Sequence, residues 1–241
     1  MSENSVSIHY SELDYRTNEA YKALRTNIQF CGDNIKVISL TSCTPNEGKS
    51  SISLNMAVAF ADIGKKVAFI DADLRKSVIM GKLKVGRIEC GLTHYLSGQS
   101  GFEDIIYNTN IRNLDMIFTG SYTPNPVELL SHERFTFMIK KLREEYDYVI
   151  IDTPPLGSVI DSAIVAKHSD GVIIVIEHNT ISYKYAQYVK EQLEVTQCRI
   201  LGVVLNKIPV SKKRYNGKYY GRYYGKYYGN YYGTYGDEHK R

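Results

Sequence analysis

The sequence predicts an α/β fold: a doubly wound, mostly parallel sheet with helices on both faces. Five runs are short and continuously apolar, without the alternation of a strand that has one exposed face. Longer stretches with helical spacing separate most of them, and 241 residues are enough for one sizeable domain. The apolar runs lie at residues 36–41, 66–71, 146–152, 171–177 and 199–206.

Helices are expected between these strands and before the first one. The helical stretches are 51–63, 126–146 and 182–195. Residues 1–17 are polar and are expected to be irregular, and Asn18 then opens a further helical stretch.

The composition changes near Pro209. Residues 211–236 form a Tyr-Tyr-Gly-x repeat that carries ten of the 21 tyrosines. Its frequent glycines oppose helix formation, and it has no aliphatic residue to bury. We therefore expect three parts: an N-terminal segment with an oligomerisation helix (1–35), an α/β domain (36–210) and a flexible tail (211–241).

Charge is divided unevenly between these parts. The net charge is +4, but the tail has eight Lys/Arg against two Asp/Glu, so the rest of the chain is close to −2. A nearly neutral body argues against a wholly basic nucleic-acid binder. The chain has no secretory signal, no apolar run of about 18 residues and no CxxC spacing. These features predict a cytoplasmic protein without disulfides or a zinc site.

A phosphate-binding loop is predicted between the first strand and the helix after it. Strand, loop, Gly-Lys-Ser and helix follow in the order that lets backbone N–H groups and a helix N-terminus converge on an anion. Lys49 would neutralise the β and γ phosphates of ATP, and the Ser50 hydroxyl would hold Mg²⁺. Cys43 stands where the usual pattern has its first glycine. The predicted nucleotide-binding residues of the loop are Pro45, Asn46, Glu47, Gly48, Lys49, Ser50 and Ser51.

Carboxylates follow two later strands directly. Asp71 and Asp73 come after residues 67–70, and Asp152 comes after residues 149–151. In open parallel sheets the ligand lies at the carboxyl ends of the strands. We therefore expect the three carboxylates to surround the metal and the phosphates of a bound nucleotide, in a fold of the P-loop ATPase type.

Several segments resemble the bacterial protein-tyrosine kinases that control capsule and exopolysaccharide synthesis. Asp-Ala-Asp-Leu-Arg, residues 71–75, and Asp-Thr-Pro-Pro, residues 152–155, are similar to the two carboxylate motifs of that family. Residues 125–130 resemble its Asn-Pro-x-Glu-Leu-Leu segment. The chain resembles the Gram-positive form, in which the cytoplasmic kinase is separate from its membrane-spanning activator.

Residues 19–25 are similar to the oligomerisation helix of the same family, Glu-x-x-Arg-x-x-Arg. The resemblance implies a subunit interface formed by Glu19, Lys22 and Arg25. Lys22 replaces the first Arg of the pattern and lacks its bidentate fork.

The resemblance also implies roles in the site. The catalytic residues would be Lys49, Asp71, Asp73 and Asp152. The metal ligands would be Ser50, Asp73 and Asp152. Asp71 is the candidate base toward the tyrosine hydroxyl, with Asp73 positioning the metal or acting as the base itself. Asn206, after the last strand, would contact adenine or cap the strand, and Arg75 would touch phosphate or lie on the surface.

Three uses of the tail can be weighed: an autophosphorylation cluster, a nucleic-acid binder, or a segment without a dedicated role. Beside a nucleotide site the first is favoured, so no nucleic-acid partner is expected. The implied enzyme is an ATP-dependent protein-tyrosine kinase that phosphorylates the tail of a neighbouring copy. The acceptors would be Tyr215, Tyr219, Tyr220, Tyr223, Tyr224, Tyr227, Tyr228, Tyr231, Tyr232 and Tyr235.

The implied partners are further copies of the chain, a tyrosine phosphatase and a transmembrane regulator of polysaccharide chain length. That regulator would activate the kinase and recruit it to the inner face of the membrane. The alternative function is a switch ATPase of the cell-division and plasmid-partition kind, with a partner-binding tail. Such proteins carry a Lys early in the phosphate loop, where this chain has Thr44.

Overall fold

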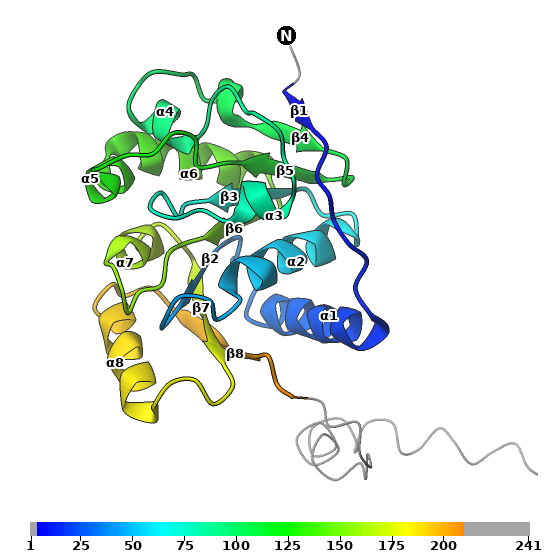
Figure 1. The fold of residues 1–241 in the computed structure, drawn as a ribbon, viewed down its shortest axis with the longest axis vertical. Coiled ribbons are helices and arrows are strands. Elements are labelled where there is room, and N and C mark those ends of the chain that lie inside the picture. Colours follow the sequence, from blue (N-terminus) through cyan, green and yellow to red (C-terminus); the bar gives the residue numbers. More distant parts are fainter. Residues whose placement is uncertain (1–3, 210–241) are drawn as a thin grey trace, which may run out of the picture. The chain divides into compact units, whose positions relative to one another are not determined.

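The structure is a computed structural model that describes residues 4–209. Strands and helices alternate through most of this range, as expected (Figure 1). The strands are β1 (Ser5–Val6), β2 (Val37–Ser42), β3 (Val67–Asp71), β4 (Tyr107–Thr109), β5 (Leu114–Ile117), β6 (Tyr148–Asp152), β7 (Gly171–Glu177) and β8 (Ile200–Asn206). The helices are α1 (Tyr15–Gln29), α2 (Lys49–Ala61), α3 (Ile79–Lys82), α4 (Leu92–Leu96), α5 (Pro126–Ser131), α6 (Glu133–Glu145), α7 (Asp161–Ala166) and α8 (Tyr183–Glu194), with a 3-10 helix at Glu103–Ile105.

The described residues form one eight-stranded sheet in the order β1-β4-β5-β3-β6-β2-β7-β8. Six neighbouring strands, from β5 to the edge strand β8, are all parallel, and β4 runs antiparallel to β5. The prediction of a mostly parallel, doubly wound sheet is therefore confirmed. Strand β2 lies inside the parallel part of the sheet, between β6 and β7, so the loop after it opens at the carboxyl edge, where such sheets bind ligands.

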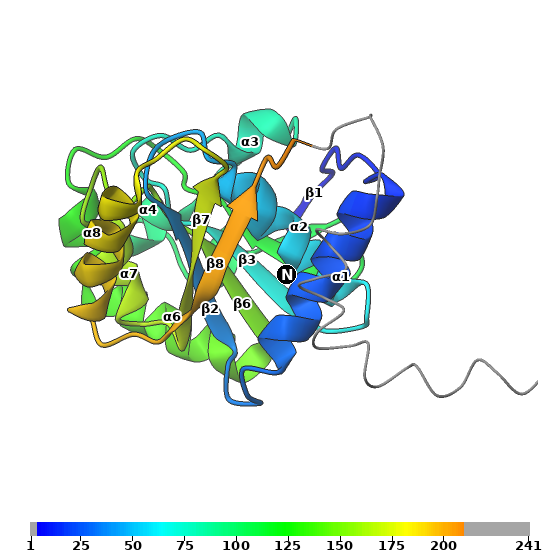
Figure 2. The same ribbon diagram turned by 90° about the horizontal axis from the view of Figure 1, so that it is seen from below.

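Helices cover both faces of the sheet. Figure 2 shows α1 and α2 on one side and α6, α7 and α8 on the other. Helix α2 packs against β6 and against α1, and ten of its residues are buried, including Lys49. This burial fixes the helix that follows the phosphate loop.

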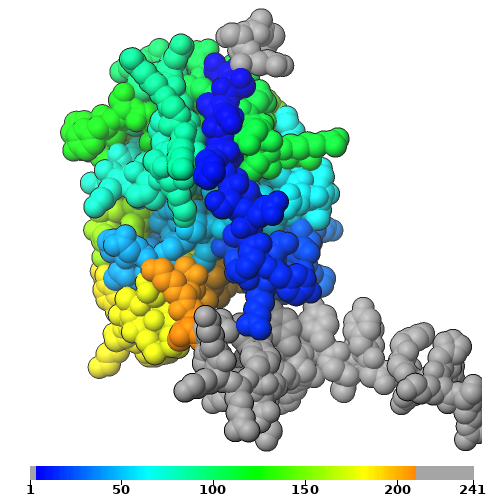
Figure 3. Space-filling view, turned by 45° about the vertical axis from the view of Figure 1, so that its right-hand side comes forward, coloured from blue at the N-terminus to red at the C-terminus, as the bar shows by residue number. Residues whose placement is uncertain are grey.

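The N-terminal segment is more ordered than the sequence predicts. Ser5 and Val6 pair in parallel with β4, and Ile8 is 3% exposed. Figure 3 shows the segment as an extended strap across the surface. Helix α1 begins at Tyr15 rather than Asn18, because the Asp14 side chain accepts hydrogen bonds from the first N–H groups of the helix. The prediction of an irregular segment up to residue 17 is therefore wrong for Ser5 and Val6, which form a strand, and for residues 15–17, which are helical.

The predicted helix at 126–146 is two helices, α5 and α6. His132 separates them with an extended backbone, φ −70° and ψ 148°, and its Nδ1 accepts a hydrogen bond from the Arg134 N–H at 3.2 Å. A side-chain cap therefore starts a new helix within a sequence that has continuous helical spacing. The short strands β1, β4 and β5 were not predicted either.

Candidate functional site

The predicted phosphate loop lies between β2 and α2. Asn46 and Gly48 have positive φ angles of 67° and 89°. The φ of Gly48 is one that other residues rarely adopt, and a Cβ atom there would lie 2.1 Å from Asn206 Nδ2 and displace that side chain, so the position favours glycine. Helix α2 begins directly at Lys49, and its N-cap residue is this glycine, which offers no side-chain cap. The unpaired N–H groups and the positive end of the helix dipole make this end of α2 suited to an anion.

Glu47 shapes the loop from inside. Its side chain is almost fully buried, and Oε2 accepts hydrogen bonds from the backbone N–H groups of Cys43 at 2.7 Å and Thr44 at 2.9 Å. Asn206 reaches the loop from the end of β8, where its Nδ2 donates to the Glu47 carbonyl oxygen at 2.8 Å. Glu47 was expected among the nucleotide-binding residues, but its carboxylate is engaged within the loop.

Lys49 and Asp152 form a buried ion pair at the base of the loop. Lys49 Nζ lies 2.8 Å from Asp152 Oδ1, and the two side chains are 7% and 1% exposed. The Ser53 hydroxyl donates to the same oxygen at 2.8 Å, and Lys49 Nζ lies 3.2 Å from Ser50 Oγ. The other oxygen, Asp152 Oδ2, is buried and has no hydrogen-bond partner among the described residues. A hydrated Mg²⁺ ion is a group that would satisfy it, so these residues fit the predicted metal.

Asp71 lies beside Asp152, because the two residues are paired in register at the ends of β3 and β6. Asp71 has no exposed surface, and the Ser77 hydroxyl donates to its Oδ2. Burial, and after it the negative charge of Asp152, raises the pKa of Asp71 from 3.8 to about 8. The carboxyl group of Asp71 therefore holds a proton at neutral pH when no cation is bound.

Asp73 and Arg75 lie farther along the loop after β3. Asp73 is partly exposed, and its Oδ1 accepts a hydrogen bond from the Lys76 N–H at 3.0 Å. Arg75 donates to both carboxylate oxygens of Asp161, at 2.8 and 2.9 Å. Asp161 is fully buried at the start of α7, so Arg75 links the β3 loop to α7 and its guanidinium group is already engaged.

Three residues near the site belong to none of the predicted motifs. Ser53 lies four positions after Lys49, on the same face of α2. This helical spacing could have identified Ser53 from the sequence as a neighbour of Lys49. Ser77 and Lys82 follow the β3 loop, and Lys82 Nζ donates to Ser51 Oγ. Their positions depend on the path of the chain between β3 and α3, for which the sequence has no local signal.

The predicted oligomerisation residues lie on α1. Lys22 Nζ and Glu19 Oε1 form an exposed ion pair at 2.8 Å. Arg25 Nη1 donates to the Ala59 carbonyl oxygen at 2.8 Å, near the C-terminal end of α2. Arg25 thus holds α1 against α2 within the protomer. The ten predicted acceptor tyrosines, from Tyr215 to Tyr235, lie outside the described residues.

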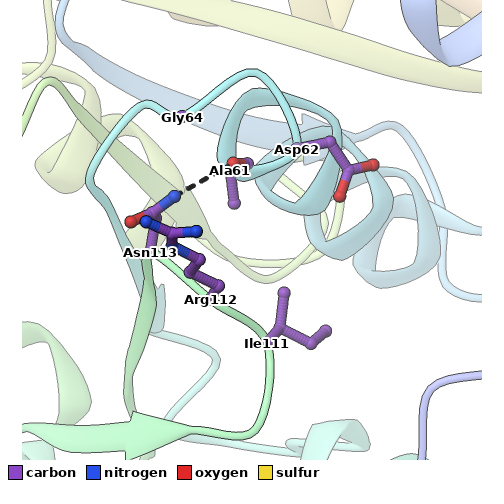
Figure 4. Close-up of a pocket in the computed structure, with 6 residues that line it drawn as sticks. All are labelled: Ala61, Asp62, Gly64, Ile111, Arg112 and Asn113. Atoms are coloured by element: carbon purple, nitrogen blue, oxygen red, sulfur yellow. Dashed lines mark hydrogen bonds between the residues drawn. The ribbon is translucent and has the colours of Figure 1, made fainter.

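A surface hollow of about 430 Å³ lies at the other end of α2 (Figure 4). Ala61, Asp62 and Arg112 line it, together with Asn113, which donates to the Ala61 carbonyl oxygen. The length of α2 separates this hollow from the phosphate loop, about 20 Å for 13 residues. Within residues 4–209 no helix is long and apolar enough to cross a membrane, and no three His, Cys, Asp or Glu side chains form a metal cluster.

Comparison with known proteins agrees with this geometry. The AAA domain family matches residues 35–200. The tyrosine-protein kinase CpsD of Streptococcus pneumoniae serotype 4 is 45% identical over 200 residues, which are 83% of this chain and 88% of CpsD. The kinase domain of the Escherichia coli tyrosine kinase ETK has a TM-score of 0.76 and 32% identity, over 82% of this chain and 79% of that one.

The switch ATPases are also similar in fold. The septum site-determining protein MinD of Pyrococcus horikoshii, solved with Mg-ADP, has a TM-score of 0.63 and 26% identity, over 73% of this chain and 72% of that one. Identity and coverage are both higher for the kinases, so the switch-ATPase alternative is less well supported. The chain has a nucleotide-binding fold of the AAA domain family, and within that family it belongs to the bacterial tyrosine-protein kinases.

Proposed function

We propose that the chain transfers the γ-phosphoryl group of ATP to the tail tyrosines of a neighbouring copy, and that this modification regulates capsule or exopolysaccharide synthesis and export. The observation that carries the proposal is the grouping of Lys49, Asp71 and Asp152 at the uncapped N-terminus of α2. The same chain bears ten tyrosines in a glycine-spaced repeat.

Each residue of the group has a task in the transfer. Mg²⁺, held by Ser50, Asp73 and Asp152, would neutralise charge on the phosphates. The N–H groups of the loop and Lys49 bind the phosphates, so the ammonium group of Lys49 exchanges part of its contact with Asp152 for the nucleotide. Asn206, already beside the loop, contacts the adenine.

Asp71 is the base in this proposal. As the phenol oxygen forms its bond to phosphorus, the bond from phosphorus to the leaving ADP oxygen breaks, and the phenol proton passes to the Asp71 carboxylate. A phenol has a pKa of about 10, so a base with a pKa near 8 is better matched to it than an ordinary carboxylate. Asp71 must first lose its own proton, which the approach of a cation to Asp152 and Asp71 favours.

The tail and the partners complete the proposal. Each phosphate adds about −1.5 to −2 charges, so four or five of them reverse the local charge of +6 and change what the tail binds. A cytoplasmic segment of a transmembrane chain-length regulator docks beside the site, activates the kinase and recruits it to the membrane. Helix α1 joins the copies through Glu19, Lys22 and Arg25, and a tyrosine phosphatase reverses the reaction.

The test is the intact mass of the full chain after incubation with ATP and Mg²⁺, with and without a peptide from the regulator. Several added phosphates between Tyr215 and Tyr235 are expected, and none in Lys49→Met once that variant is shown to be folded. ATP turnover without added mass, under both conditions, would contradict the proposal and favour a switch ATPase.

A further inference from the structure

Lys82 brings a second lysine to the phosphate site. It is the last residue of α3, and its Nζ donates to Ser51 Oγ. Ser51 is the third residue of α2, two positions after Lys49, so the Lys82 ammonium group lies at the first turn of the helix that follows the loop.

This location is unfavourable for a cation in the protein alone. The N-terminus of a helix carries a partial positive charge, and lysine is stabilised at the opposite end. Lys49, in the same turn, is already paired with Asp152, so that carboxylate is shared between two ammonium groups. Desolvation lowers the pKa of the Lys82 ammonium group, although much of the residue is exposed. The negative charge of Asp152 raises this pKa and offsets part of the effect. A polyanion at the N-terminus of α2 would give the Lys82 ammonium group a counter-charge that it lacks beside the helix end.

The backbone of Lys82 is held in place by its neighbours. Ile79 and Leu83, on either side of it, are buried at 0% and 2% exposure. The Leu83 carbonyl oxygen also accepts a hydrogen bond from the His9 N–H at 2.8 Å, which ties this point to the N-terminal strap. The position of the Lys82 backbone is therefore set by packing rather than by its contact with Ser51.

We propose that Lys82 is a nucleotide-binding residue, whose ammonium group contacts the phosphates of ATP from the α3 side while Lys49 binds them from α2. This inference rests on the proposed ATP site. On binding, the Lys82 ammonium group exchanges its hydrogen bond to Ser51 for a charge-assisted bond to a phosphate oxygen, which is stronger.

The test compares the affinity for Mg·ATP of the full chain with that of Lys82→Met, which keeps the apolar stem, and of Lys82→Arg, which keeps the charge. Lys82→Gln is measured beside them, so that the result does not depend on the folding of one variant. Lys140→Met, at an exposed lysine of α6, is the matched control. We expect affinity to fall on the order of tenfold in Lys82→Met and Lys82→Gln and to stay near the wild-type value in the other two variants.

Salt separates a direct phosphate contact from a structural effect. The difference between Lys82→Met and wild type should be large at about 0.05 M salt and should nearly vanish at about 1 M, because the lost contact is ionic. Equal affinities at low salt, or a difference that is the same at all salt concentrations, would overturn the inference. Wild-type protein that does not bind ATP would instead reject the proposed function.

Discussion

Replacing Asp71 with Asn should make the protein more stable when metal and nucleotide are absent. Asp71 is fully buried beside Asp152, and its pKa is raised to about 8. Asn has a similar shape: its amide can donate to the Ser77 hydroxyl, and its oxygen can accept the Asp73 N–H bond that now reaches Asp71 Oδ1 at 3.3 Å. The substitution therefore removes an ionisable group while it keeps the local contacts.

The size of the effect follows from the two states of the carboxyl group. Below pH 3.8 Asp71 is protonated in the folded and the unfolded chain, and it has no effect on their balance. Between that pH and about 8 the unfolded chain releases the proton and the folded chain keeps it, so the free energy of unfolding falls as pH rises. At pH 7 about 3 units of this window have been crossed, which at about 1.4 kcal/mol per unit gives roughly 4 kcal/mol. Relaxation and water penetration reduce such penalties, so we expect a gain of about 2 to 4 kcal/mol in Asp71→Asn.

Urea denaturation in the presence of a metal chelator measures this gain at a series of pH values. The difference between variant and wild type should grow from about pH 4 to about pH 8 and then level off. Asp73→Asn, in the same loop but at a partly exposed position, controls for the loss of a negative charge. A gain that does not change with pH, or a loss of stability at pH 7, would contradict a raised pKa for Asp71.

Three further single substitutions, and one double variant, test the interactions that hold the loop. Lys49→Met should lower the free energy of unfolding by about 3 to 5 kcal/mol, because it leaves the buried Asp152 carboxylate without its cation. Adding Asp152→Asn to this variant should recover part of the loss. Urea denaturation measures both effects, and equal stabilities of Lys49→Met and the wild type would contradict the first. Gly48→Ala should abolish measurable ATP binding in a titration, because its Cβ would collide with Asn206 at a φ of 89°; wild-type affinity would show that the loop adapts. Glu47→Ala should lower stability by about 1 to 3 kcal/mol in the same denaturation assay, because the buried Cys43 N–H and the partly buried Thr44 N–H lose their acceptor. An unchanged midpoint would be inconsistent with that role.

The strands that can be predicted from the sequence are those whose own residues show that they are buried. A strand covered on both faces by helices is apolar at consecutive positions, and the runs that became β3 and β7 show this directly. Strands β1 and β4 have only two and three residues, too few for a pattern. The pairing of β1 with β4 also joins residues about 100 positions apart in the chain, such as Ser5 and Asn108, which local sequence does not encode.

The candidate site divides in the same way. Lys49, Asp71 and Asp152 could be placed together from the sequence, because strand ends in a parallel sheet meet at one edge. The burial of the Glu47 side chain within the loop and the position of Lys82 beside Ser51 could not be predicted, because both depend on how separate segments pack in three dimensions. The link between Arg75 and Asp161 is another case, since it joins two loops whose neighbourhood exists only in the folded sheet.

The most direct test of the account is whether the phosphoryl group passes from one copy of the chain to another. An acceptor copy carries Asp71→Asn and an intact tail, and a donor copy has the active site but phenylalanine in place of the ten tyrosines from Tyr215 to Tyr235. The two are mixed with ATP, Mg²⁺ and the regulator peptide, and their intact masses are read separately. Phosphates are expected on the acceptor when the donor is present, and none on either copy alone. An acceptor that gains no mass in the mixture, under conditions in which the wild-type chain modifies itself, would contradict transfer between copies.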